Sequence, residues 1–125
     1  MSINKTAIIL LALSSPAYAG QAEKFPETVA RIQVLAKETL AAKYAVRWCI
    51  GEKIKMNDDV MGRKWNLPTM LQQDEFNQII EASMIETRTK LDEKVSQYGL
   101  DYVCKATVKI LQSGPRNEWP IIKSN

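Results

Sequence analysis

Apolar side chains recur at helical spacing in the first long segment of the chain. Residues 27–55 contain no proline and are rich in Ala, Leu, Lys and Glu, which are good helix formers. Charged residues such as Arg31 and Lys43 fall between the apolar positions, as on a helix with one buried face. We expect one long helix here, with its last turn weakened by Gly51. The positions predicted to be buried are Val29, Ile32, Leu35, Thr39, Ala42, Val46 and Cys49.

Two further helices are predicted in the second half of the chain. The second opens at Thr69, through a capping box with Gln72, or at Asp74, and it ends before Gly99. Its predicted buried positions are Phe76, Ile80, Met84, Thr87, Leu91, Val95 and Tyr98. The third helix starts with Asp101 as its N-cap and ends at Gly114. Its predicted apolar side comprises Val103, Cys104, Thr107, Val108 and Leu111.

The remaining segments lack a helical period. Residues 56–68 contain several turn formers, and residues 115–125 read as an irregular tail. No segment resembles a strand bounded by hairpin turns. The sequence therefore predicts an all-α fold, a single domain of three or four helices that spans residues 20–125.

The first nineteen residues have the three regions of a secretory signal peptide. Lys5 gives a positive start, Ala7–Leu13 is a short apolar run, and Ala17-Tyr18-Ala19 is a small-residue cleavage site. A membrane anchor would need about 20 apolar residues, so this run is too short to span a bilayer. We expect cleavage after Ala19 and a product that is soluble in the bacterial periplasm or secreted, without a stable membrane anchor.

Two cysteines, Cys49 and Cys104, remain in the exported chain. An even cysteine count in an oxidising compartment predicts a disulfide, and one pair allows a single connectivity. A redox-active pair normally has Cys-x-x-Cys spacing, whereas these cysteines lie 55 positions apart. Both fall on predicted core-facing positions, so we predict a structural disulfide that joins the first and last helices.

Composition narrows the possible chemistry. The chain has no histidine, which excludes a Ser-His-Asp triad, a Cys-His dyad and a His-ligated zinc site. The full chain carries a net charge of +3; removal of Lys5 with the signal peptide leaves +2, too little to dominate binding to nucleic acid. We expect no cofactor, no metal and no enzymatic activity. The carboxyl groups that a cell-wall hydrolase could use are Glu52, Asp58, Asp59, Asp74, Glu75, Glu81 and Glu86.

Large apolar residues also occur outside the predicted helical faces. They are Met61 and Trp65 in the middle segment and Trp119, Ile121 and Ile122 in the tail. Such residues either fold back to complete a small core or form a hot spot for another protein. These five residues are the candidate partner-binding residues, and the partner is either another protein or a second copy of this chain.

The segment Tyr44-Ala45-Val46-Arg47-Trp48-Cys49-Ile50 resembles a helix of the Tai4-type periplasmic immunity proteins, which guard bacteria against type VI secreted amidases. Cys104 is similar to the second disulfide cysteine of that family. The resemblance implies an all-helical, dimeric inhibitor that binds a peptidoglycan hydrolase. Residues 59–76 depart from the family, so its inhibitory surface is not carried over.

Together these features favour an exported, non-enzymatic helical protein that acts by protein–protein contact in the periplasm. Immunity against a peptidoglycan hydrolase is a specific case of this function. An envelope-stress protein with chaperone-like action is an alternative, although without histidine only carboxyl groups could sense acid. A carboxylate-based cell-wall hydrolase is the remaining alternative.

Export makes a direct prediction about the N-terminus. Protein purified from the periplasm of the bacterium that encodes this chain should begin at Gly20, because the peptidase cuts after the small residue Ala19. N-terminal sequencing or intact-mass measurement checks this, and cytoplasmic material from cells with blocked export is the control. A periplasmic protein that still begins at Met1 contradicts the prediction.

Overall fold

The computed structural model describes residues 24–67, 71–113 and 120–125. The predicted signal peptide, Thr69 and Trp119 lie outside these residues. The described residues form four α-helices, a 3-10 helix and a two-stranded sheet, which confirms the all-α class. In chain order the elements are α3 (Pro26–Trp48), η1 (Ile50–Glu52), β1 (Ile54–Met56), α4 (Asp58–Trp65), α5 (Gln73–Tyr98), α6 (Leu100–Ser113) and β2 (Ile122–Ser124).

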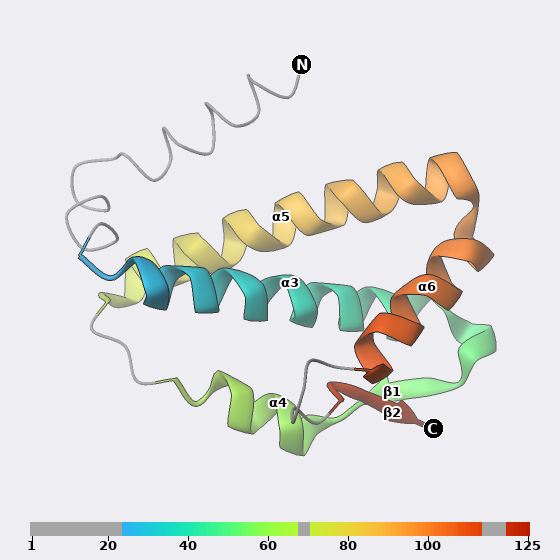
Figure 1. The fold of residues 1–125 in the computed structure, drawn as a ribbon, viewed down its shortest axis with the longest axis horizontal. Coiled ribbons are helices and arrows are strands. Elements are labelled where there is room, and N and C mark those ends of the chain that lie inside the picture. Colours follow the sequence, from blue (N-terminus) through green and yellow to red (C-terminus); the bar gives the residue numbers. More distant parts are fainter. Residues whose placement is uncertain (1–23, 68–70, 114–119) are drawn as a thin grey trace.

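The two longest helices, α3 and α5, lie side by side and run in the same direction (Figure 1). The short helix α4 lies between them in the sequence; it runs in the opposite direction and packs against α3. After α5 the chain reverses at Gly99, and α6 packs against both long helices near their C-terminal ends. The sheet lies beside the last turns of α6 and closes that end of the core.

The first helix ends at Trp48, so the prediction that it continues to residue 55 was wrong. Cys49 leaves the helical conformation, and Lys53 adopts a left-handed backbone with φ of 51°. The chain then forms β1, which pairs antiparallel with β2, with Ile54 opposite Ser124. The prediction of no strands and an irregular tail was therefore also wrong for residues 54–56 and 122–124.

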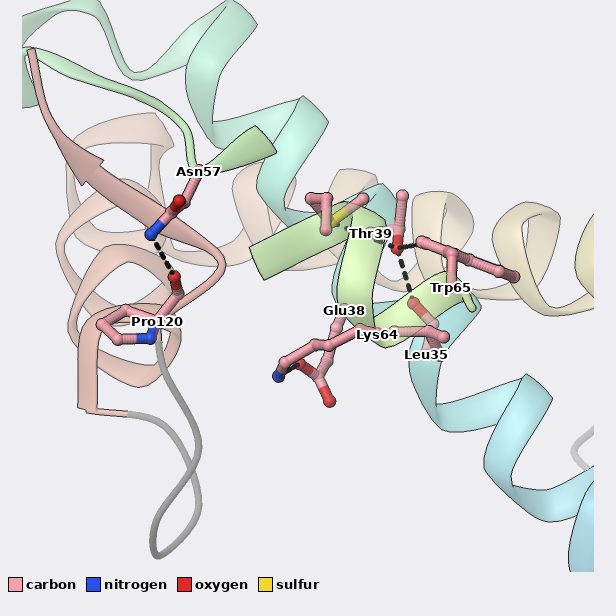
Figure 2. A network of polar contacts seen from close by, with 8 residues as sticks. Leu35, Glu38, Thr39, Asn57, Lys64, Trp65 and Pro120 are labelled. Carbon is pink, nitrogen blue, oxygen red and sulfur yellow. Dashed lines mark hydrogen bonds and ion pairs between the residues drawn. The ribbon is translucent and has the colours of Figure 1, made fainter. Parts of the chain in front are cut away.

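The middle segment contains α4, which the sequence analysis did not predict. Asn57 precedes the helix and Asp58 and Asp59 occupy its first turn, where their charges suit the positive end of the helix dipole. The Asn57 side-chain amide donates a hydrogen bond to the Pro120 carbonyl oxygen, at 3.1 Å (Figure 2). Residues that resembled a turn thus start a helix and tie the tail to it.

The second helix is present and ends before Gly99 as predicted, but it begins at Gln73, so Asp74 lies in its first turn and does not cap it. Its buried face is also rotated. Its buried residues are Glu75, Ile79, Ser83 and Leu91. The predicted positions Phe76, Ile80, Met84, Thr87 and Val95 are half-buried, and Tyr98 is exposed. The face that meets α3 is therefore centred about one residue earlier than the apolar pattern indicates. The third helix begins at Leu100, so Asp101 lies in its first turn and the prediction of Asp101 as N-cap was wrong. Its buried residues Val103, Cys104, Val108 and Leu111 match the prediction.

The predicted disulfide joins Cys49 and Cys104, whose Cα atoms are 5.4 Å apart. Both cysteines belong to the larger of two core clusters, which also contains Ala45, Ile121 and Ile122. The second cluster lies near the other end of α3 and α5 and is built from Val29, Ile32, Leu71 and Ile79. The tail isoleucines are 1% exposed, so they complete the core at the disulfide end.

A polar contact fixes α4 against the long helices (Figure 2). Thr39 is buried on α3; its hydroxyl donates to the Leu35 carbonyl oxygen at 2.7 Å and accepts from Trp65 Nε1 at 3.0 Å. The Trp65 ring also meets Phe76 of α5 edge to face, with centroids 6.2 Å apart. Because Trp65 satisfies its polar nitrogen and packs on two helices, it acts as an anchor for α4.

Removal of the disulfide should destabilise this domain strongly. The bond closes a loop of 56 residues, and the chain-entropy relation gives a stabilisation of about 4 kcal/mol. The double variant Cys49→Ala/Cys104→Ala should lower the free energy of unfolding by about that amount in urea titration of residues 20–125. Reduced wild type is the control and should have the same urea midpoint as the double variant. Equal midpoints for oxidised wild type and the double variant would contradict the prediction.

Candidate functional site

Exposed aromatic and aliphatic side chains gather at the end of the molecule where α3 and α5 stop. In the described part of the chain, eight large hydrophobic residues are exposed, and five of them belong to this end. We call these five the aromatic end: Trp48, Ile50, Tyr98, Leu100 and Tyr102. Large exposed apolar groups in one region are typical of a binding surface, whereas single ones are ordinary.

The disulfide and one glycine set the backbone that carries these residues. Trp48 and Ile50 flank Cys49 at the end of α3, and Tyr102 lies two residues before Cys104 on α6. Gly99 has a φ of 88°, a conformation that favours glycine, and it turns the chain sharply from α5 into α6. The C-terminal ends of α3 and α5 and the start of α6 therefore lie at the same end of the molecule (Figure 1).

The rings at this end form two separate pairs. The Tyr98 and Tyr102 rings have centroids 5.2 Å apart, and the Tyr44 and Trp48 rings have centroids 6.5 Å apart. The Arg47 guanidinium lies 5.1 Å from the centroid of the Trp48 ring, within cation–π range. Two aromatic pairs and a stacked arginine thus remain accessible at the surface.

Tyr44 links this surface to α5 through a polar contact. Its hydroxyl donates a hydrogen bond to Asp92 Oδ1 at 3.2 Å, and Arg88 lies 4.0 Å from the same carboxylate. Partial burial, followed by the negative charge and the hydrogen bond of Asp92, raises the pKa of Tyr44 above its ordinary value. This contact holds Tyr44 against α5, beside the Trp48 ring.

This composition suits recognition of a protein. Tryptophan, tyrosine and arginine are the residues most enriched among those that dominate binding energy at protein interfaces. Aromatic rings supply large contact areas and lose little conformational entropy on binding, because they have only two side-chain torsions. The aromatic end contains two of these residue types, tryptophan and tyrosine, and Arg47 lies against its Trp48 ring.

The structure places the sequence-predicted binding residues elsewhere. Ile121 and Ile122 are buried, Met61 is half-buried against the core, and Trp65 anchors α4. Their side chains complete the core, which is the first of the two roles considered for them. Trp119 lies outside the described residues.

Sequence reasoning missed Trp48, Tyr98 and Tyr102 as surface residues. Tyr98 continued the apolar period of the second helix and was therefore assigned to its buried face. A usable signal was present, because Tyr98 and Tyr102 are four residues apart on either side of a helix-ending glycine. Two large aromatic residues at a helix boundary have fewer neighbours to cover them than two in the middle of a helix.

The candidate carboxyl groups of a hydrolase are spread over several elements. Asp58 and Asp59 lie in the first turn of α4, and Asp74 and Glu75 lie in the first turn of α5. Lys90 donates a hydrogen bond to Glu86 at 2.9 Å and lowers the pKa of that carboxyl, whereas a catalytic acid needs a raised pKa. Over residues 24–67, 71–113 and 120–125 there is no cluster of three or more Cys, Asp or Glu side chains that could hold a metal ion.

Comparison of the chain with protein-family models, curated proteins and solved structures found no match. Among the helices of the described residues, none combines the length and the apolar character needed to cross a membrane.

The Tyr44–Asp92 contact predicts a measurable pH effect. Because the folded protein holds the Tyr44 proton more tightly, the phenol should ionise above its ordinary pKa of about 10. The resulting stabilisation is complete below the unfolded pKa and is lost as the pH rises through the folded pKa. The difference in phenolate absorbance between wild type and Tyr44→Phe isolates this titration.

Asp92→Asn should lower the midpoint of that titration, because it removes the negative charge beside the phenol. Tyr98→Phe is the matched control and should leave the midpoint of Tyr44 in place. A Tyr44 midpoint at or below the ordinary value would contradict the assigned contact.

Proposed function

We propose that this protein is exported to the bacterial periplasm, has no enzymatic activity and acts by binding another protein through its aromatic end. The observation that carries the proposal is the exposure of Trp48, Tyr98 and Tyr102 at the end of the molecule where one disulfide ties the end of α3 to α6. Tyr102 is 60% exposed and Trp48 is 43% exposed, so both rings keep substantial apolar area in water. A partner that covers this area gains its transfer free energy without unfolding any part of the domain.

The rigidity of the site supports this proposal. Ordering side chains and loops on association costs about 0.5–1.5 kcal/mol for each immobilised flexible side chain. Here the backbone of η1 and the start of α6 is tied by a buried disulfide, and ring contacts already restrict the aromatic side chains. Most of the contact energy therefore remains available for affinity.

A peptidoglycan hydrolase is the partner class that the sequence resemblance suggests. The segment with that resemblance, residues 44–50, contributes Arg47, Trp48 and Ile50 to the exposed surface or its edge. In this form of the proposal, the aromatic end covers the substrate cleft of a secreted amidase and protects the cell wall of the producing bacterium.

Site-specific photocrosslinking in the periplasm tests the binding proposal. A photoreactive amino acid at position 102 should capture a protein, whereas the same group at position 85 should not. Ile85 is the matched control because it is also 60% exposed but lies on α5, outside the aromatic end. Identical crosslinked products from both positions would contradict the proposal.

With the captured protein in hand, Trp48→Ala should weaken its binding about thirtyfold, the loss typical of a central tryptophan. Ile85→Ala should leave the affinity unchanged, and circular dichroism should show both variants folded. A hydrolase partner that this protein inhibits would support the immunity form. Clearing of peptidoglycan by the purified protein alone would overturn its assignment as a non-enzyme.

A further inference from the structure

The C-terminal segment, residues 120–125, is seated in the fold in the manner of a bound peptide. Its strand β2 pairs antiparallel with β1 (Figure 1). Ile121 and Ile122 insert into the core cluster at the disulfide end, where each is 1% exposed. The other buried residues of that cluster come from α3, β1 and α6 and from Cys49. The pocket for the two isoleucines is therefore built entirely by residues outside the segment that fills it.

Main-chain groups hold the segment on both sides of the strand. The Asn57 N–H donates to the Ile121 carbonyl oxygen at 2.8 Å, and the Asn57 side-chain amide donates to that of Pro120. Figure 2 shows the second of these bonds. The Asn125 N–H donates to the Lys53 carbonyl oxygen at 2.8 Å. Any extended segment can make main-chain hydrogen bonds of this kind, so the pocket for the side chains is what selects the occupant.

One side-chain pair weakens the attachment of the segment. Lys55 of β1 lies directly opposite Lys123 of β2. Both are exposed, and neither has an ion-pair partner within the residues that the structure describes. Like charges directly opposite each other destabilise an antiparallel pair of strands, whereas opposite charges stabilise it. A segment with an acidic residue at the place of Lys123 would therefore fit this site better than the protein's own segment does.

The sheet is also too short to hold the segment by itself. Each strand has three residues, and a two-stranded sheet is marginally stable even when it is longer. Segments with few hydrogen bonds at a chain end open at a lower free energy than packed helices do. The segment therefore depends mainly on its two isoleucines, which another aliphatic pair can replace.

We infer that the C-terminal segment is displaceable and that its site binds an extended segment of a partner protein, with two consecutive aliphatic residues followed by an acidic one. The aliphatic pair takes the places of Ile121 and Ile122, and the acid faces Lys55. Because the incoming strand refills the pocket, the exchange leaves no empty cavity in the core. This site shares no residue with the aromatic end, so the inference does not rest on the proposed function.

Hydrogen exchange of the mature chain, residues 20–125, tests whether the segment opens by itself. Under conditions where the rate reports the opening equilibrium, the Asn57 amide should exchange faster than that of Ile32, which is buried on α3. Lys123→Glu should slow the exchange of Asn57 about fivefold, because it turns a repulsive cross-strand pair into an attractive one. Lys94→Glu makes the same charge change at an exposed position on α5, and as the matched control it should leave the rate unchanged.

Binding is tested with the end-blocked peptide Pro-Ile-Ile-Glu-Ser-Asn, which is the segment with glutamate at the place of Lys123. Added to isotope-labelled protein, it should shift the NMR signals of the Asn57 and Lys55 amides. The peptide with the native lysine should bind about fivefold more weakly, and Pro-Asp-Asp-Glu-Ser-Asn should not bind. The protein variant Lys123→Glu should bind the glutamate peptide about fivefold more weakly than wild type, because its own segment competes better for the site.

Exchange of the Asn57 amide at the same rate as that of Ile32 would overturn the inference, because the segment would then leave only when the whole domain unfolds. Absence of binding by the glutamate peptide would also overturn it. Equal affinity of wild type and Lys123→Glu for that peptide would do the same, since the peptide would then bind elsewhere. A dimer in which two copies exchange their segments, detected as concentration-dependent exchange of the Asn57 amide, would contradict a partner protein as the occupant.

Discussion

The buried bond between Cys49 and Cys104 is the constraint on which the arrangement of the molecule depends. It fixes the point where α3 stops and the face of α6 that turns inward, and it does so across a loop that contains α4 and α5. Exposed residues cannot position themselves by burial, since they remain in water. The aromatic end therefore owes its geometry to the covalent tie beneath it, with both cysteines at most 5% exposed.

Trp48 and Trp65 illustrate how one residue type serves different purposes in a small domain. Trp65 supplies packing and a hydrogen bond between helices, so its removal would loosen the attachment of α4 to α3. Trp48 contributes little to the core, because it is 43% exposed.

Glu75 is a buried acidic residue whose carboxylate oxygens have no hydrogen-bond partner within the described residues. Its place in the first turn of α5 gives it the favourable field of the helix dipole.

Local patterns were sufficient to predict that the three longer helices exist and that the cysteines pair, since predicted core positions such as Ile32, Ala42 and Val108 are buried. The two strands were not predictable in this way, because each has three residues and its partner lies far away in sequence. The buried position of Ile121 depends on its backbone contact with Asn57, which only the folded chain creates. The exposure of Trp48 was not predicted either, because local spacing does not show which neighbours cover a residue at the end of a helix.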